Sequence, residues 1–324
     1  MTEKKIYTVT LQPSGVVFEG DSESTILDSA VSAGIVLEHS CKTGVCGVCE
    51  AQVFSGDGQT ELSVVLTCQH KPTSDMNLKA EYFPELDTIK CMTFPAKVSQ
   101  VLLKAENIMV LKLRYPPKSK FSFLPGQYID LKYQGVTRSY SLASIPNEEN
   151  TIELHFKRVE RGEMSEKIFA PIAENQLLQL EGPKGTFFLR DKKAGPIIFI
   201  ATGTGYAPVK SMVSDFIQKQ QFDRPIYVYW GNRSSNLFYD KQQLLEWANN
   251  IEILNAELCL SRSDIGWTGR IGYVQDCVLE DGISLSDAEV YACGSIEMIE
   301  SAKSSLIGAG LDKDSFYSDA FVAS

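Results

Sequence analysis

Four cysteines constrain this chain more than any other feature. Cys41, Cys46 and Cys49 follow the spacing C-x4-C-x2-C, and Cys68 follows later in the chain. Three cysteines within nine residues would make a poor core and a cramped disulfide framework, so disulfides or four buried thiols are the weaker interpretations. Zinc sites built from cysteine usually combine two C-x2-C pairs, and only one such pair occurs here.

This spacing is typical of a plant-type [2Fe–2S] cluster. Two irons bridged by two sulfides need four thiolates that converge on one small object. A short loop can supply three of them only if its backbone folds back on itself, and Gly44 and Gly47 permit this because glycine reaches positive φ without a Cβ clash. We therefore expect Cys41, Cys46, Cys49 and Cys68 to be the metal ligands.

Residues 1–84 make the first predicted domain. Alternating residues around a Pro-Ser-Gly turn predict a β-hairpin over 6–18, and strands are expected at 50–54 and 64–68. The order strand, strand, helix, cysteine loop, strand, strand suits the α+β fold of a β-grasp ferredoxin.

A capped helix is expected between the hairpin and the cysteine loop, over residues 24–34. Ser24 is the expected N-cap and Gly34 the end of the helix. The expected buried stripe consists of Ile26, Leu27, Ala30 and Val31.

A linker is expected at 85–95, followed by a second domain over 96–192. Short alternating runs separated by turn residues predict a small antiparallel β-barrel of six strands there. The barrel carries the motif Arg138-Ser139-Tyr140-Ser141. It also carries Gly162-Glu163-Met164-Ser165, which opens a helix and so suits an anion. Each motif has a plain alternative, since the first tetrapeptide occurs by chance and the second is commonly a helix cap.

Residues 193–324 switch to alternating strands and helices, which predicts an α/β domain with a parallel sheet. After the apolar strand 196–201, Gly203-Thr204-Gly205 leads to Pro208 and a helix. Strand, glycine turn and helix is the arrangement that binds dinucleotide phosphates, here without the third glycine of the usual fingerprint. Two further glycines end later strands, Gly231 and the Gly294 of Cys293-Gly294, at the edge where such sheets bind ligands.

Composition excludes several classes of protein. The net charge of −10 over 324 residues argues against a nucleic-acid partner. The apolar runs are too short to span a bilayer, and the N-terminus does not resemble a signal peptide. We therefore expect no membrane insertion and a location in the reducing cytoplasm. The acidic balance could steer a basic protein partner, although solubility is the simpler explanation.

From Ala96 onward the chain resembles the ferredoxin–NADP reductase superfamily. It carries the motifs of that superfamily in the same order, R-x-Y-S, GxxS, G-T-G-x-A-P and C-G. With a ferredoxin module in front, it is similar to the NADH-dependent iron–sulfur flavoprotein reductases. Segments 182–188, 208–212 and 316–321 most resemble the members that serve the dehydrase of 3,6-dideoxyhexose synthesis. Reductases of oxygenases share the layout and most of the motifs.

The resemblance implies FAD on the barrel and a nicotinamide nucleotide on the α/β domain. Arg138 would pair with the flavin pyrophosphate, Tyr140 would stack on the isoalloxazine, and Ser141 would hydrogen-bond near N5. Gly162 and Ser165 would hold the pyrophosphate of FAD.

The glycine turn, Gly203, Thr204 and Gly205, would cradle the NAD pyrophosphate by the same resemblance, with Pro208 and Gly231 beside it. Cys293 and Gly294 would lie against the nicotinamide, although a buried strand-end thiol explains Cys293 equally well.

Ser261-Arg262 is similar to the pair that grips the 2′-phosphate in members that use NADPH. We favour a solvated loop arginine, so NADH is the expected donor and NADPH remains possible.

The implied activity passes electrons from NAD(P)H to FAD, then to [2Fe–2S], then to a partner protein. The expected partner is the pyridoxamine-phosphate-dependent dehydrase of CDP-3,6-dideoxyhexose synthesis. An oxygenase component for an aromatic or other hydrocarbon is the alternative, and a non-enzymatic iron–sulfur sensor is a third. His39, His70 and His155 receive no catalytic role.

Overall fold

The computed structural model describes residues 4–54, 61–170, 172–221, 223–262 and 266–321. It divides into two compact units, Met1–Lys90 and Cys91–Ser324. Residues 55–59, the short segment between the strands expected at 50–54 and 64–68, lie outside the described residues.

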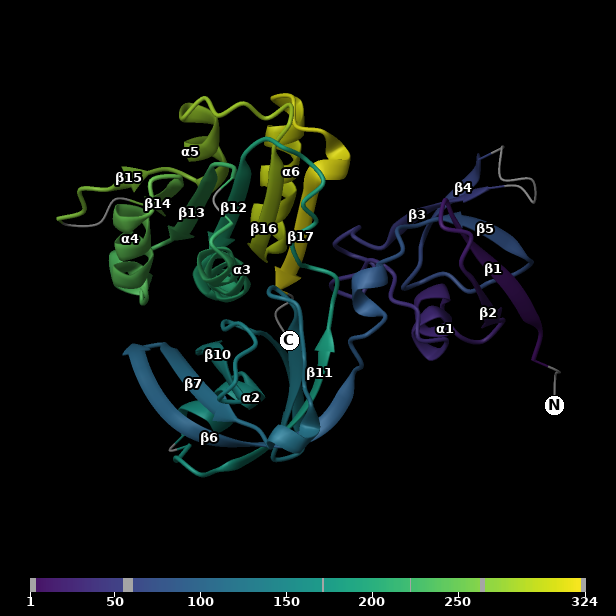
Figure 1. Ribbon diagram of the computed structural model, residues 1–324, viewed down its shortest axis with the longest axis horizontal. Helices are drawn as coiled ribbons and strands as arrows, with labels where there is room; N and C mark the ends of the chain where they lie inside the picture. The colour runs from purple at the N-terminus through teal and green to yellow at the C-terminus, as the bar shows by residue number, and fades with distance from the viewer. Residues whose placement is uncertain (1–3, 55–60, 171, 222, 263–265, 322–324) are drawn as a thin grey trace. The chain divides into compact units, whose positions relative to one another are not determined.

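In its described residues, the first unit is a mixed five-stranded sheet with one α-helix, drawn in purple and blue in Figure 1. The sheet has the order β2-β1-β5-β3-β4, in which β1 and β5 run parallel and the other neighbours run antiparallel. Its elements are β1 (Ile6–Gln12), β2 (Val17–Asp21), α1 (Ile26–Ser32), β3 (Glu50–Phe54), β4 (Glu61–Leu66) and β5 (Met76–Lys79). This is the β-grasp arrangement that the sequence predicts, with β5 added.

The helix α1 differs from its prediction in its N-cap and in its buried face. Thr25, not Ser24, is the N-cap, because its Oγ1 accepts a hydrogen bond from the Asp28 N–H at 3.1 Å. Ser24 instead binds the side chain of Asp21. Val31 was also expected to be buried, but it is 52% exposed. The helix is only two turns long, so its buried face narrows to Ile26, Leu27, Ser29 and Ala30.

The second unit begins with the barrel. Six antiparallel strands follow the order β10-β7-β6-β11-β8-β9, and the bridge between Leu142 and Leu154 joins the two outer strands. The elements are β6 (Met92–Ala105), β7 (Ile108–Arg114), β8 (Tyr128–Tyr133), β9 (Val136–Ser141), β10 (Thr151–Lys157), α2 (Glu163–Phe169) and β11 (Leu177–Lys184). Because β6 begins at Met92, the last residues of the expected linker belong to the barrel.

A parallel six-stranded sheet follows, with the order β15-β14-β13-β12-β16-β17. The elements are β12 (Ile197–Thr202), α3 (Tyr206–Lys219), β13 (Ile226–Asn232), α4 (Lys241–Asn250), β14 (Leu254–Leu260), β15 (Arg270–Ile271), α5 (Val274–Glu280), β16 (Glu289–Ser295), α6 (Ile296–Gly308) and β17 (Phe316–Phe321).

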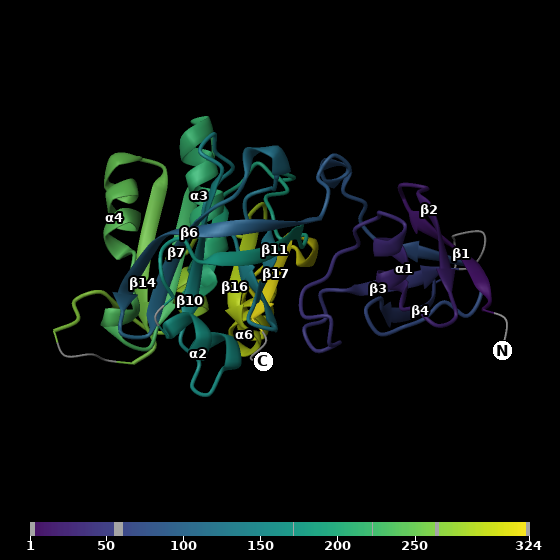
Figure 2. The same cartoon turned by 90° about the horizontal axis from the view of Figure 1, so that it is seen from below.

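The order in which strands are added to this sheet reverses between β12 and β16. The chain first adds β13, β14 and β15 on one side of β12, and then adds β16 and β17 on the other. Right-handed crossovers then place α3 and α4 on one face and α5 and α6 on the other. Figures 1 and 2 show α3 and α6 on opposite sides of the strands. A reversal of this kind opens a ligand crevice beyond the carboxyl ends of the two central strands.

The barrel and the parallel sheet share one apolar core. Ile108, Val110 and Phe187 of the barrel join the cluster that contains Val209 and Met212 of α3. The helix α3 therefore lies between the two layers, as Figure 1 shows. This shared core explains why the two predicted domains form one compact unit.

Candidate functional site

The four cysteines of the first unit fall into two pairs. Cys49 Sγ and Cys68 Sγ lie 3.2 Å apart, which exceeds the roughly 2.05 Å of a disulfide bond. The thiols of Cys41 and Cys46 interact through their side chains. Two pairs of convergent thiols match a donor set for two irons, so these residues fit a [2Fe–2S] cluster.

Backbone donors surround the first thiol. The N–H groups of Thr43 and Cys46 each donate to Cys41 Sγ at 3.4 Å. Burial would raise the pKa of Cys41, but these hydrogen bonds outweigh it and lower the pKa to about 6. These two donors therefore stabilise negative charge on the Cys41 sulfur, as a thiolate ligand requires. Burial instead raises the pKa of Cys46 and Cys49.

The loop turns as the sequence predicts, since Gly44 has φ +80 and Gly47 has φ +70. Sequence reasoning missed Gln69, whose Nε2 donates to the Lys42 carbonyl at 3.2 Å and lies 3.5 Å from Cys68 Sγ. The strand expected at 64–68 ends at Leu66, so the fourth cysteine lies in the turn after β4, and Gln69 ties the cysteine loop to this turn. A hydrogen bond to a ligating sulfur also tunes a cluster's potential.

On the barrel, the R-x-Y-S motif lies on β9. Tyr140 packs its ring 4.3 Å from the ring of Phe156, and burial raises its pKa to about 12. Ser141 is buried at the end of the strand, and Arg138 donates from its guanidinium to the Thr137 carbonyl at 2.8 Å. One aromatic face, one hydroxyl and one permanent cation fit the parts of a flavin dinucleotide.

The second barrel motif opens α2, with Gly162 as its N-cap. Ser165 is buried, and its Oγ accepts a hydrogen bond from the Val159 N–H at 2.8 Å. The serine therefore fixes the loop that leads into the helix.

The structure brings the glycine turn against the Cys-Gly end of β16. Gly205 lies so close that a Cβ there would overlap the carbonyl oxygen of Cys293. A Cβ on Gly294 would likewise meet the hydroxyl of Thr202. Gly203 has φ +57 and open space around it. The two motifs thus meet at the topological switch point, although 88 residues separate Gly205 from Cys293.

Three other residues predicted for this edge lie around the turn. Pro208 is buried in α3, Thr204 is half-buried, and Gly231 at the end of β13 packs against Val274 and Thr202.

Next to Gly231, the buried Asn232 Nδ2 has no hydrogen-bond partner among the described residues. An unmet donor at the ligand-binding edge of the sheet fits an incoming nucleotide.

Cys293 itself is fully buried, and burial raises the pKa of its thiol well above the ordinary value. It therefore remains a neutral thiol. Ser261 donates its N–H to the Asn232 carbonyl at 3.1 Å, whereas the Arg262 side chain is exposed.

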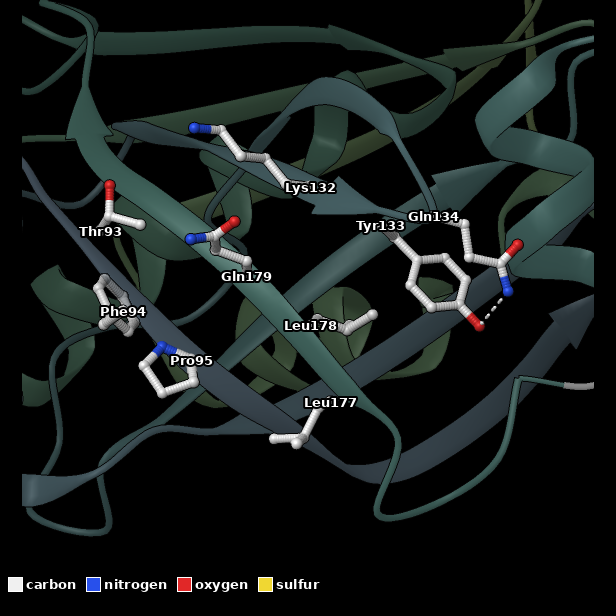
Figure 3. A pocket seen from close by; sticks show the side chains of 9 residues that line it. All are labelled: Thr93, Phe94, Pro95, Lys132, Tyr133, Gln134, Leu177, Leu178 and Gln179. Atoms are coloured by element: carbon white, nitrogen blue, oxygen red, sulfur yellow. Dashed lines mark hydrogen bonds between the residues drawn. The ribbon is translucent and has the colours of Figure 1, made fainter.

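A shallow groove lies elsewhere on the barrel, along β6, β8 and β11 (Figure 3). It is lined by Thr93, Phe94, Pro95, Lys132, Tyr133, Gln134, Leu177, Leu178 and Gln179. None of the residues predicted to bind flavin lines this groove, so it is not the predicted flavin site.

Within the described residues, no helix combines the length and apolar character that a membrane span requires.

Three domain families match the chain in the predicted order. The "2Fe-2S iron-sulfur cluster binding domain" covers residues 9–73, the "Oxidoreductase FAD-binding domain" covers 95–189, and the "Oxidoreductase NAD-binding domain" covers 199–304. The predicted fold class and the three cofactors, [2Fe–2S], FAD and NAD(P)H, are thereby confirmed.

Full-length relatives extend this match. Protein RfbI of Salmonella typhimurium is 45% identical over 98% of this chain and 97% of its own length. The CDP-6-deoxy-L-threo-D-glycero-4-hexulose-3-dehydrase reductase of Yersinia pseudotuberculosis is 43% identical over 98% of both chains. The reductase component of the naphthalene 1,2-dioxygenase system of Pseudomonas putida is 29% identical over 96% of this chain and 97% of its own.

Among solved structures, an Amycolatopsis cytochrome P450 reductase is 25% identical, with a TM-score of 0.76 over 98% of this chain and 99% of its own. The ferredoxin reductase of carbazole 1,9a-dioxygenase shares the fold at a TM-score of 0.71 and 24% identity, over 99% of this chain and 100% of its own. The chain therefore belongs to the iron–sulfur flavoprotein reductases of the ferredoxin–NADP reductase superfamily, and it passes electrons from NAD(P)H through FAD and a [2Fe–2S] cluster to a partner protein.

Proposed function

We propose that this reductase supplies electrons to the dehydrase of CDP-3,6-dideoxyhexose synthesis, as a CDP-6-deoxy-Δ3,4-glucoseen reductase. The observation that carries the proposal is the step in identity between two groups of full-length relatives. Identity is 43% to the Yersinia dehydrase reductases, against 29–30% to the reductases of the naphthalene and terephthalate dioxygenases. All of them cover nearly the whole chain, so the difference does not come from a missing domain.

The proposed flavin site is the face of the barrel that carries β9. Arg138 would turn from the Thr137 carbonyl to the pyrophosphate, and Tyr140 would cover one face of the ring system. Bound FAD supplies the exchange between hydride and single electrons that a nicotinamide and a one-electron cluster cannot make directly. Ser141 would orient the ring edge from a buried position, while Gly162 and Ser165 would shape the loop at the pyrophosphate.

The proposed nicotinamide site is the meeting point of the glycine turn and β16. Gly203, Thr204 and Gly205 form a 3-10 turn that runs directly into α3, so the N–H groups of this helix N-terminus would face the pyrophosphate. The neutral, buried thiol of Cys293 and the small Gly294 would border the nicotinamide and exclude water. Pro208, Gly231 and the unmet donor of Asn232 complete this edge.

NADH is the proposed donor. Arg262 is exposed, with no resolved partner among the described residues, as a solvated loop arginine would be. The reducing cytoplasm, where NADH is available and cysteines stay out of disulfide bonds, is the proposed location.

The test is single-turnover reoxidation. The protein is reduced anaerobically with one equivalent of NADH and mixed with the pyridoxamine-phosphate-dependent dehydrase and its CDP-sugar, or with an oxygenase component and its substrate. We expect rapid reoxidation by the dehydrase only, with the sugar deoxygenated in proportion. Rapid reoxidation by the oxygenase component, with the dehydrase inert, would reverse the assignment to the alternative partner.

A further inference from the structure

A buried cluster of polar side chains lies between the barrel and the parallel sheet, within the second unit. Glu153 and His155 stand on β10, Lys210 on α3, and Tyr239 and Asp240 just before α4. The His155 side chain is fully buried, and those of Glu153, Lys210 and Asp240 are only 10–14% exposed. Sequence analysis gave none of these residues a role.

The hydrogen bonds form one connected chain. His155 Nδ1 lies 2.7 Å from the Tyr239 hydroxyl, and Nε2 lies 2.8 Å from Glu153 Oε1. Burial lowers the pKa of His155 and keeps the ring neutral, so Nε2–H donates to the carboxylate and Nδ1 accepts from the tyrosine. Lys210 Nζ then bridges Glu153 at 2.8 Å and Asp240 at 2.6 Å.

Lysine side chains already supply positive charge to this cluster. Glu153, His155 and Asp240 place ligand atoms within 4.8 Å of one another, as a metal site would. However, the Lys210 ammonium lies between the two carboxylates, and Lys104 Nζ lies 3.5 Å from Asp240. Two cations already balance two anions, so a divalent metal would add uncompensated positive charge.

On the flavin side, two residues of the cluster lie on β10, which is bridged to the residue that directly follows the R-x-Y-S motif. Leu154, between the two polar residues of β10, bridges to Leu142, which directly follows Ser141. The Ala143 N–H donates to the Glu153 carbonyl at 2.9 Å. Any shift of this part of β10 therefore moves the segment that begins at Ser141.

On the nicotinamide side, the cluster holds the glycine turn in two ways. The Tyr239 ring packs edge-on against Trp230 at 5.2 Å, and Trp230 Nε1 donates to the Gly203 carbonyl at 2.9 Å. Lys210 belongs to the helix that directly follows the turn.

We infer that Glu153, His155, Lys210, Tyr239 and Asp240 form an interlayer clasp that sets the position of the glycine turn relative to Ser141, and thereby the approach of the nicotinamide to the flavin. These are positioning residues, since they act through Ser141 and Gly203. The inference rests on the hydride site proposed above. Apolar packing between the barrel and the parallel sheet is non-directional, whereas a chain of short hydrogen bonds fixes one position of β10 relative to α3.

The experiment measures flavin reduction alone, by stopped-flow mixing of the anaerobic FAD-loaded protein with NADH. Tyr239→Phe removes one hydroxyl from the clasp at nearly constant volume, and Lys210→Met removes its central cation. The matched control is Lys219→Met on the same helix, whose ion pair with Asp215 is 2.7 Å long but whose side chain is 54% exposed.

We expect the rate constant at saturating NADH to fall about 10-fold or more in Lys210→Met and several-fold in Tyr239→Phe, because small misplacement of reacting groups is costly. The amplitude of flavin bleaching should remain at the wild-type level in Tyr239→Phe, since it counts the folded, FAD-loaded fraction. The isotope effect with NADH deuterated at C4 should be at least as large as in wild type. Lys219→Met should match wild type in every respect.

Rate constants within twofold of wild type in Tyr239→Phe would overturn the inference, and so would a loss confined to the amplitude. If Lys210→Met fails to fold, Tyr239→Phe still decides the question. Because the measurement ends at the flavin, a wrong choice of acceptor protein cannot affect it. Failure of the hydride site itself would show separately, as wild-type protein whose flavin NADH does not reduce.

Discussion

The two ends of the electron path are built in different ways. Cys41, Cys46 and Cys49 lie in one nine-residue loop, whose own N–H groups donate to sulfur, and only Cys68 comes from elsewhere. The proposed hydride site draws instead on β9, β10, β12, α3 and β16, whose residues approach one another only after the barrel and the parallel sheet have packed together. A local site depends on its own turn geometry, whereas an assembled site depends on packing between layers. The two should therefore respond differently to substitution.

The largest expected effect breaks the local end. Cys49→Ser removes one thiol of the pair that lies 3.2 Å apart, and should abolish the spectroscopic signal of the cluster. NADH-dependent cytochrome c reduction should fall by more than about 100-fold, which exceeds the usual effect of losing a residue that only hydrogen-bonds to a metal ligand. Flavin reduction by NADH should continue, because the residues of the proposed hydride site belong to the other unit. The control is Cys91→Ser, which changes an exposed thiol. Loss of flavin reduction in Cys49→Ser alone would show that the two ends are not independent.

The next effect breaks the assembled end. A methyl group at Gly205 would overlap the Cys293 carbonyl and displace the glycine turn, and a displacement of about 1 Å can cost about 100-fold in rate. Gly205→Ala should therefore lower kcat/KM for NADH by about that factor, measured with ferricyanide, while the iron content stays unchanged. Gly308→Ala, in open space near the end of α6, is the control. Wild-type kinetics in Gly205→Ala would mean that the glycine turn can accommodate a methyl group without moving the bound nucleotide.

A smaller effect is expected at the flavin alone. Arg138→Ala would remove a charge-assisted contact worth roughly 1.5–3 kcal/mol, so the affinity for FAD should fall about 10- to 140-fold. Titration of the FAD-depleted protein with FAD measures this directly, and Arg114→Ala on β7 serves as the control. Equal FAD affinity in Arg138→Ala and wild type would remove Arg138 from the flavin site.

The smallest effect concerns the nucleotide's 2′-phosphate. Arg262 is exposed, so Arg262→Ala should change kcat/KM for NADH by less than about twofold. Steady-state kinetics with both nucleotides make the comparison. A large loss that is selective for NADPH would assign Arg262 to the 2′-phosphate and make NADPH a physiological donor.

The same contrast explains what the sequence could reveal. The cysteine loop and the strand–turn–helix around Gly203 are contiguous, so their spacing carries the chemistry. No alternating run in the sequence marks β9, because Thr137, Arg138 and Ser139 interrupt its apolar alternation, in keeping with a face left open for a ligand. Strands β5 and β15 also lack a clear sequence pattern, because β5 has a single fully buried residue, Leu78, and β15 has only two residues.

The interlayer clasp could not be predicted for a further reason. Glu153 and Lys210 are 57 residues apart, and Lys210 and Asp240 are 30 apart. Each residue alone is typical of a solvated surface. Only the packing of β10 against α3 turns them into a buried chain of hydrogen bonds, and no local pattern records that packing.

The most direct test of the account is a stepwise anaerobic titration of the wild-type protein with NADH, followed by optical and electron paramagnetic resonance spectroscopy. Bleaching of the flavin absorption should be accompanied by a paramagnetic signal from a reduced two-iron cluster that integrates to about one electron per chain, as electron splitting between FAD and [2Fe–2S] requires. A fully reduced flavin beside a cluster that never accepts an electron would contradict the account.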